Sequence, residues 1–218
     1  MLDPAFLVAA SVLALTPGPG IAYVLARTVT GGRNQGLATT AGAAFGGMVH
    51  VIAAVAGLSF LIAQSAFWFS LIKYLGAAYL VHLGIRTLMA STKPIELSEV
   101  DAPTVNAPSQ QGHAPHRAAW RAWVEGVVVE TLNVKTALFF LAFLPQFIVA
   151  DQPVTTHLLI MGTICVGLNT LMDLIVVLSA HRLMSTGALR AARSRWMQRA
   201  SGLTMVGLGA WLALARRQ

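Results

Sequence analysis

Charged side chains interrupt an apolar stretch in the second half of the chain. Residues 122–149 contain the hexapeptide Glu130-Thr131-Leu132-Asn133-Val134-Lys135, with apolar runs on both sides. A charge at the centre of a bilayer costs roughly 2.5–3.5 kcal/mol on insertion scales, so such groups face a cavity or a partner. The ammonium of Lys135 could bind a carboxylate, and Glu130 could bind an amine or carry a proton. A structural ion pair between helices is the alternative.

Asp173 is a third charge within an apolar stretch. Asn169 lies four residues before it, which places both side chains on one helical face. Asp173 is a candidate proton carrier or cation site, or a structural partner for an arginine at a helix end. The candidates for proton coupling are therefore Glu130 and Asp173.

A second unusual segment lies in the first apolar stretch, at Thr16-Pro17-Gly18-Pro19-Gly20. Proline removes a backbone donor and glycine weakens a helix, so this segment predicts a break between two helical halves. Irregular backbone at membrane depth is tolerated only where it is buried in protein or lines a wet cavity. Discontinuous helices of this kind form the midplane binding sites of transporters. A simple proline kink is the alternative.

Asn133 predicts a matching break in the fourth apolar stretch, because asparagine is a favoured N-cap. The second halves of both helices would then direct backbone amides toward the centre of the membrane. Those amides and Lys135 would favour an anion, such as a substrate carboxylate. The predicted substrate site consists of Thr16, Pro17, Gly18, Pro19, Gly20, Glu130, Asn133 and Lys135.

The remaining candidate residues predict little chemistry. His50 and His82 lie in apolar stretches, where a lone histidine more often packs and hydrogen-bonds than reacts. His113 and His116 have a spacing that suits a metal, but nothing nearby completes a site. Cys165 is the single cysteine, so it forms no internal disulfide. We therefore expect no metal and no cofactor.

The composition is that of an integral membrane protein. Of the 218 residues, 56% are hydrophobic and 11% charged, against roughly 25% charged in soluble domains. The excess of basic residues would suggest nucleic-acid binding only in a soluble chain. Here it fits the cytoplasmic loops of a membrane protein. The N-terminus lacks the basic segment of a cleaved signal peptide.

Six membrane spans are predicted, and they divide into two halves of three. A polar linker, residues 91–120, separates a first repeat at 1–90 from a second at 121–218. Because each half has an odd number of spans, the two repeats would be inverted, a common transporter plan. The fold prediction is an all-α membrane protein whose first and fourth helices are interrupted. The spans are 4–26, 37–63, 67–90, 122–149, 154–180 and 200–215.

The distribution of Lys and Arg predicts that both termini lie outside. With that orientation, eleven of the 15 basic residues fall in cytoplasmic loops. The span 200–215 is short, and a five-helix arrangement with the C-terminus inside would satisfy the same rule. Small residues such as Gly42 and Gly46, four apart, predict a close approach between helices and permit a homodimer.

Several motifs together resemble the LysE/RhtB family of amino-acid exporters. They occur in the family's order and span most of the chain: Thr16-Pro17-Gly18-Pro19, Lys73-Tyr74-Leu75-Gly76-Ala77-Ala78-Tyr79-Leu80, Leu132-Asn133-Val134-Lys135-Thr136-Ala137-Leu138-Phe139-Phe140 and Leu144-Pro145-Gln146-Phe147. The resemblance implies a bacterial inner-membrane exporter of amino acids or related small metabolites, driven by proton antiport and without ATP.

The sequence departs from the family's pattern at three places. Gly20 stands where asparagine usually follows the first motif, Val134 replaces a proline, and Glu130 replaces a common asparagine. These changes favour a substrate with an additional cationic group, or altered proton coupling. The partners expected are the solute, protons and lipid. Two rival functions are a membrane-embedded enzyme that uses Glu130 and Asp173, and a membrane assembly subunit that does not transport.

Overall fold

The computed structural model describes residues 3–64, 66–90, 115–148, 153–184, 199, 202–211 and 213–214. All regular elements in these ranges are helical, as the sequence predicts. Apolar side chains pack into one core, which is rich in aromatic residues of the second half, and the cavity described below lies beside it. The largest fully buried side chains of this core are those of Phe6, Phe139, Phe140, Phe143, Leu144, Leu158 and Met161.

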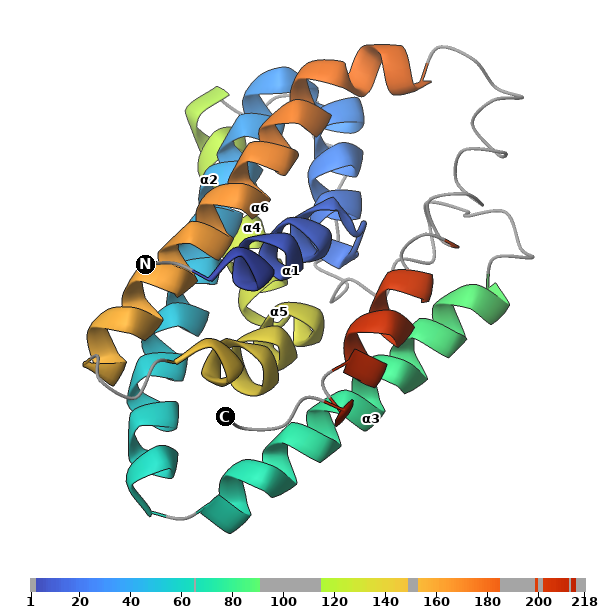
Figure 1. Ribbon diagram of the computed structural model, residues 1–218. Coiled ribbons are helices and arrows are strands. Elements are labelled where there is room, and N and C mark those ends of the chain that lie inside the picture. Colours follow the sequence, from blue (N-terminus) through green and yellow to red (C-terminus); the bar gives the residue numbers. More distant parts are fainter. Residues whose placement is uncertain are drawn as a thin grey trace.

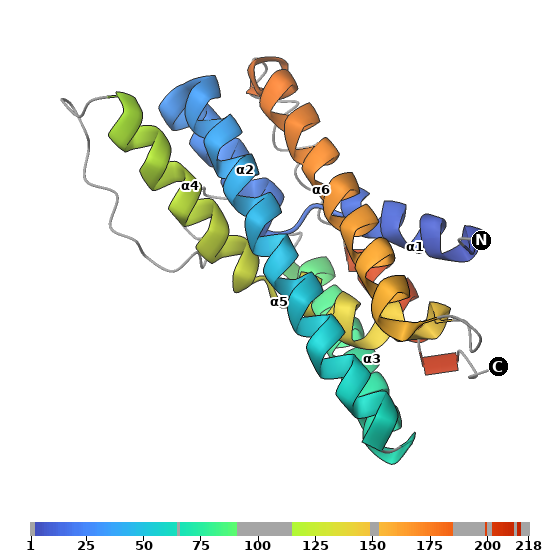
Figure 2. The same ribbon diagram turned by 90° about the vertical axis from the view of Figure 1, so that its left-hand side faces the viewer.

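The first helix is interrupted where the prolines and glycines predict it. Helix α1 (Pro4–Leu15) begins after Asp3, whose carboxylate accepts the backbone N–H of Ala5, and it ends at Thr16 in an extended conformation. Helix α2 (Pro19–Gln64) follows after three non-helical residues, Thr16, Pro17 and Gly18. In both views α1 runs across the long helices rather than in line with α2 (Figures 1 and 2).

Helix α2 turns back on itself at Gly32. This glycine has a φ of 79°, a conformation that side chains other than glycine rarely adopt. A Cβ on Gly36 would lie 2.2 Å from the Oγ1 of Thr28. Residues eight apart in a straight helix are about 12 Å apart, so the chain has reversed between them. The bend separates residues 19–31 from residues 33–64.

The fourth predicted span is also interrupted. Helix α4 (Pro115–Thr131) ends two residues before α5 (Val134–Leu138), and the Asn133 carboxamide accepts the backbone N–H of Lys135 as an N-cap. A π-helical turn η1 (Phe139–Phe143) and a 3₁₀ turn η2 (Leu144–Phe147) continue the segment. Helix α4 begins at Pro115, within the segment 91–120 for which a polar linker is predicted, and proline suits a first helical turn.

Helix α2 packs against both α4 and α6 (Val154–Met184), and these three long helices lie side by side in Figure 2. The predicted close approach at Gly42 and Gly46 is confirmed. A Cβ on Gly42 would lie 2.0 Å from the backbone oxygen of Trp123 on α4. A Cβ on Gly46 would lie 2.7 Å from the backbone oxygen of Val127 on the same helix. Only glycine permits this spacing, which fixes α2 and α4 together.

Helix α3 (Ala66–Ala90) lies beside the short apolar helix Gly202–Trp211 (Figure 1). They also approach closely through glycine, since a Cβ on Gly84 would lie 2.7 Å from the backbone oxygen of Gly202. In the part of the chain that the structure describes, Pro19–Gly57, which contains the bend at Gly32, and Val154–Ala180 are long and apolar enough to cross a bilayer. The pair His116–Thr131 and Val134–Phe147, bent by 44°, would make a third. Six spans and the inverted repeat remain predictions.

Candidate functional site

Lys135 reaches from the second break to the first. Its Nζ donates to the backbone oxygens of Thr16, at 2.7 Å, and of Leu13, at 3.3 Å. Both oxygens belong to the end of α1, where helical carbonyls lack intrahelical partners. The side chain is buried. Gly18 makes the approach possible, since a Cβ there would lie 3.1 Å from Nζ.

Glu130 lies on the other side of the same break. Its carboxylate accepts hydrogen bonds from the Asn133 amide, at 3.0 Å, and from the Thr136 hydroxyl, at 2.7 Å. It also lies against Gly20 in the first turn of α2, where a Cβ would be 2.8 Å from Oε2. A side chain at position 20 would therefore displace the carboxylate.

The two charges thus complement the ends of two helices. An ammonium lies at the C-terminal end of α1 and a carboxylate at the N-terminal end of α2, the arrangement that the helix dipoles favour. Glu130 and Lys135 do not form a direct ion pair with each other, unlike the pairs that Glu125 makes. The first break is consequently held by two charges from the second half of the chain, while Glu130 also holds the second break through Asn133 and Thr136.

A cavity opens between the two breaks. It is small, with a solvent-accessible volume of about 30 Å³, and α6 supplies Asn169, Thr170 and Asp173 to its wall. Asp173 is buried. Within the described ranges its carboxylate has no hydrogen-bond or ion-pair partner, whereas Glu130 has two donors. The other lining residues come from the two breaks, from α2 and from α6, namely Gly18, Gly20, Ile21, Ala43, Ala44, Gly47, Glu130, Asn133, Lys135, Thr136 and Val166.

The structure therefore brings most of the predicted site residues to one place. Thr16 is buried and provides a carbonyl for Lys135, while Pro17 is half-buried and Pro19 is exposed. Neither proline lines the cavity. Their position at the ends of α1 and α2 is consistent with shaping the break.

The histidines and the cysteine have other surroundings. The Nε2 of His50 donates to the backbone oxygen of Glu130 at 2.9 Å, so this residue supports the site from behind. His82 is exposed on α3, and Cys165 is buried in the core. His113 lies outside the described residues. No cluster of three or more possible metal ligands occurs in the ranges that the structure covers.

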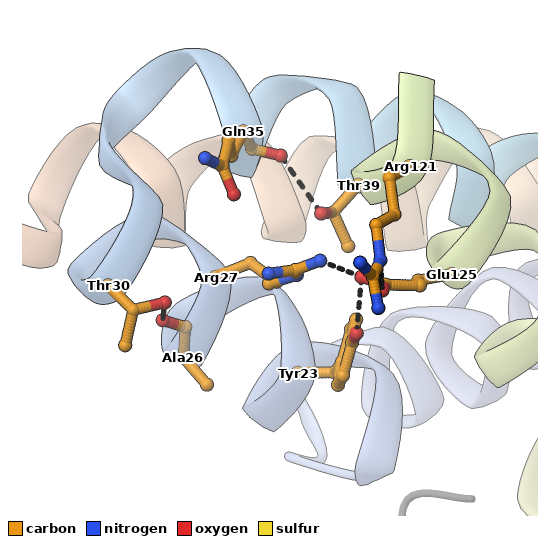
Figure 3. Close-up of polar contacts among 8 residues, drawn as sticks. All are labelled: Tyr23, Ala26, Arg27, Thr30, Gln35, Thr39, Arg121 and Glu125. Carbon is orange, nitrogen blue, oxygen red and sulfur yellow. Dashed lines mark hydrogen bonds and ion pairs between the residues drawn. The ribbon is translucent and has the colours of Figure 1, made fainter. Parts of the chain in front are cut away.

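Sequence reasoning missed a third buried carboxylate, Glu125, which lies on α4 (Figure 3). It accepts a hydrogen bond from the Tyr23 hydroxyl at 2.9 Å and forms ion pairs with Arg27 and, at 3.0 Å, with Arg121. Figure 3 shows Tyr23 and Arg27 reaching it from α2. The i,i+4 spacing of Arg121 and Glu125 was visible in the sequence, but it is equally typical of a solvated helix face.

A break in two helices, each held by a buried charge beside a polar cavity, is an arrangement suited to a small polar solute. Comparison of the sequence with protein families supports a role in transport. The model of the LysE type translocator matches residues 11–216, nearly the whole chain. The chain belongs to this family. As a LysE type translocator it is a multi-pass membrane transporter and not an enzyme.

Curated relatives align with nearly the whole length of the translocator. The uncharacterized membrane protein YrhP of Bacillus subtilis (strain 168) is 29% identical over 94% of this chain and 95% of its own length. The homoserine/homoserine lactone efflux protein of Salmonella typhimurium is 28% identical over 97% of this chain and 96% of its own. The protein of the same name from Salmonella typhi is also 28% identical. No solved structure matches the chain significantly.

Proposed function

We propose that this translocator is a secondary exporter of amino acids or related small metabolites across the bacterial inner membrane, driven by exchange for protons. The observation that carries the proposal is the cavity between the two breaks, which combines three buried charges with amide and hydroxyl groups. Buried charges in a membrane protein are costly and are retained where they serve a solute or ion path. The efflux function in the names of two relatives supports the same class of substrate.

The substrate would bind between Gly18–Gly20 and Asn133–Thr136. Lys135 uses two of its three N–H donors on backbone oxygens, so one remains for a substrate carboxylate. Glu130, or Asp173 across the cavity, would receive the substrate's amine. With two carboxylates and one ammonium, the site has room for one additional positive charge, either on the substrate or as a proton.

Geometry favours Asp173 over Glu130 as the proton carrier. Two donors already stabilise the ionised form of Glu130. Asp173 is buried beside the cavity without a comparable donor in the described part of the chain. Burying an unpaired carboxylate is unfavourable, so a proton or a substrate cation would stabilise it. Alternate occupation by these two cations would produce exchange.

The two halves of the chain would rearrange around this fixed site, opening it first to one side and then to the other. With both termini outside, as the charge distribution predicts, the polar segment before α4 faces the cytoplasm. Loading would then take place from the α4 N-terminal side and release from the opposite side.

Transport by the purified protein in proteoliposomes tests the proposal. Vesicles loaded with homoserine or another amino acid should take up labelled substrate by counterflow, and an imposed pH gradient should accelerate efflux. Vesicles with a buffered, equal pH on both sides control for leakage. Absence of counterflow with every amino acid and analogue tested would refute the proposed function.

A further inference from the structure

The second buried charge cluster, defined by Tyr23, Arg27, Arg121 and Glu125, does not line the substrate cavity. It lies next to it. Glu125 precedes Glu130 by five residues on α4, which corresponds to about 7.5 Å along the helix axis. Tyr23 follows the cavity residue Ile21 by two positions on α2. The cluster is therefore located between the cavity and the end of α4 at Pro115.

We propose that this cluster is the gate that closes the substrate cavity on the side of the polar linker, which the charge distribution predicts to be cytoplasmic. The inference rests on the proposed transport function, because a gate has meaning only on a transport path. It assigns a role to four residues that the proposed binding site does not use.

The contacts join two elements that could separate. Tyr23 and Arg27 come from α2, and Arg121 and Glu125 come from α4, so every bond from Tyr23 or Arg27 to Glu125 crosses the interface (Figure 3). The guanidinium of Arg27 also lies 5.9 Å from the centre of the Tyr23 ring. Glu125 is 5% exposed, so the cluster excludes water from this point of the interface.

The α2 side of the gate is a segment with non-helical backbone at both ends. Residues 19–31 lie between the break at Thr16–Gly18 and the bend at Gly32. Rotation at these two points would move Tyr23 and Arg27 away from α4. Residues 33–64, in contrast, remain fixed to α4 through the glycine contacts at Gly42 and Gly46. Alternating access requires that one part of a transporter moves against another around the site, and here residues 19–31 are the part free to move.

One hydrogen-bond donor in the closed gate has no partner, which favours a contact that can open. The Nε of Arg27 is buried and has no hydrogen-bond partner within the described residues. An unpaired buried donor is energetically unfavourable. Relief of that cost on exposure to water offsets part of the energy needed to separate Arg27 from Glu125.

The test measures access to the cavity from the linker side. Ala43, which lines the cavity, is replaced by cysteine in a Cys165→Ala background, and a membrane-impermeant thiol reagent is applied to that side in oriented proteoliposomes. We expect Arg27→Gln and Glu125→Gln each to raise the labelling rate at least about fivefold. Arg33→Gln is the matched control, because Arg33 is exposed on the same helix and should leave the rate unchanged.

A purely structural role for the cluster predicts another outcome. The variants would then be less stable to heat, but the labelling rate of the folded fraction would match that of Arg33→Gln, and this result would overturn the gate. Tyr23→Phe keeps the test valid if the charge variants fail to fold, since it removes only one hydroxyl and should raise labelling two- to threefold. Unchanged labelling in folded Tyr23→Phe would likewise overturn it.

The labelling rate also separates the gate from the proposed function. Wild-type protein that shows no counterflow would refute transport, whatever the labelling rates are. Wild-type protein that transports, combined with equal labelling in all variants, would refute the gate alone.

Discussion

Helix α4 carries two buried carboxylates, and their surroundings differ in kind. Glu125 is paired with two guanidinium groups and a phenol, and it does not line the substrate cavity. Glu130 is held by an amide and a hydroxyl, lies against the first turn of α2 and lines the cavity. Burial of a charge therefore does not identify a transport site by itself. The guanidinium groups neutralise Glu125 and hold the two helices together. The neutral donors leave the negative charge of Glu130 uncompensated, so that it can interact with a solute.

The largest predicted loss of transport comes from replacing Lys135, which lines the same cavity as Glu130. Lys135→Met keeps the volume but leaves the oxygens of Leu13 and Thr16 without their charged donor. Hydrogen bonds to charged groups contribute about 1.5–3 kcal/mol each, so counterflow should fall at least about tenfold. Counterflow in proteoliposomes and thermal stability in detergent measure the two consequences. Arg33→Met is the control, and equal counterflow in both variants would exclude Lys135 from the site.

Asp173→Asn should separate proton coupling from exchange. The amide cannot exchange a proton, so a pH gradient should no longer drive efflux, while counterflow, which needs no net proton movement, should persist at a reduced rate. Asp3→Asn is a matched control outside the cavity, since asparagine also caps a helix. Gradient-driven efflux that persists in Asp173→Asn would assign the proton to another group, and Glu130→Gln would be examined next.

Gly20→Ala should produce a smaller effect that a second substitution reverses. The added Cβ would lie 2.8 Å from Glu130 Oε2 and would push the carboxylate out of place, raising the KM several-fold. Glu130→Asp shortens the side chain, so the double variant should transport better than Gly20→Ala. Gly57→Ala is the control, because no atom lies within 4 Å of its Cβ position. Additive losses in the double variant would show that the two residues act independently.

The smallest predicted effect concerns His50, which supports Glu130 through a backbone hydrogen bond. His50→Ala removes a bond that contributes about 1 kcal/mol, so counterflow should fall about two- to fivefold. His50→Gln keeps a donor and should recover part of the loss. A loss as large as that of Lys135→Met would give His50 a direct role in transport, and the comparison of the two carboxylates would then be incomplete.

The sequence predicted the breaks because proline, glycine and an N-cap asparagine act locally. It also predicted the helix approach at Gly42 and Gly46, which depends on residue size alone. The crossing direction of α1 was not predictable, because the order of segments does not determine the angle at which they pack. Glu125 was missed for a related reason, since its α2 partners lie about a hundred positions away in the chain and its nearest cation suggested an ordinary surface pair.

Protection of the cavity by substrate tests the central claim most directly. In the Cys165→Ala background, Ala43→Cys lies in the cavity wall and Arg33→Cys lies on the exposed surface of α2. We predict that a transported amino acid slows thiol labelling of Ala43→Cys several-fold and leaves that of Arg33→Cys unchanged. Equal labelling rates with and without substrate, in Ala43→Cys protein that still transports, would place the solute elsewhere and contradict the account.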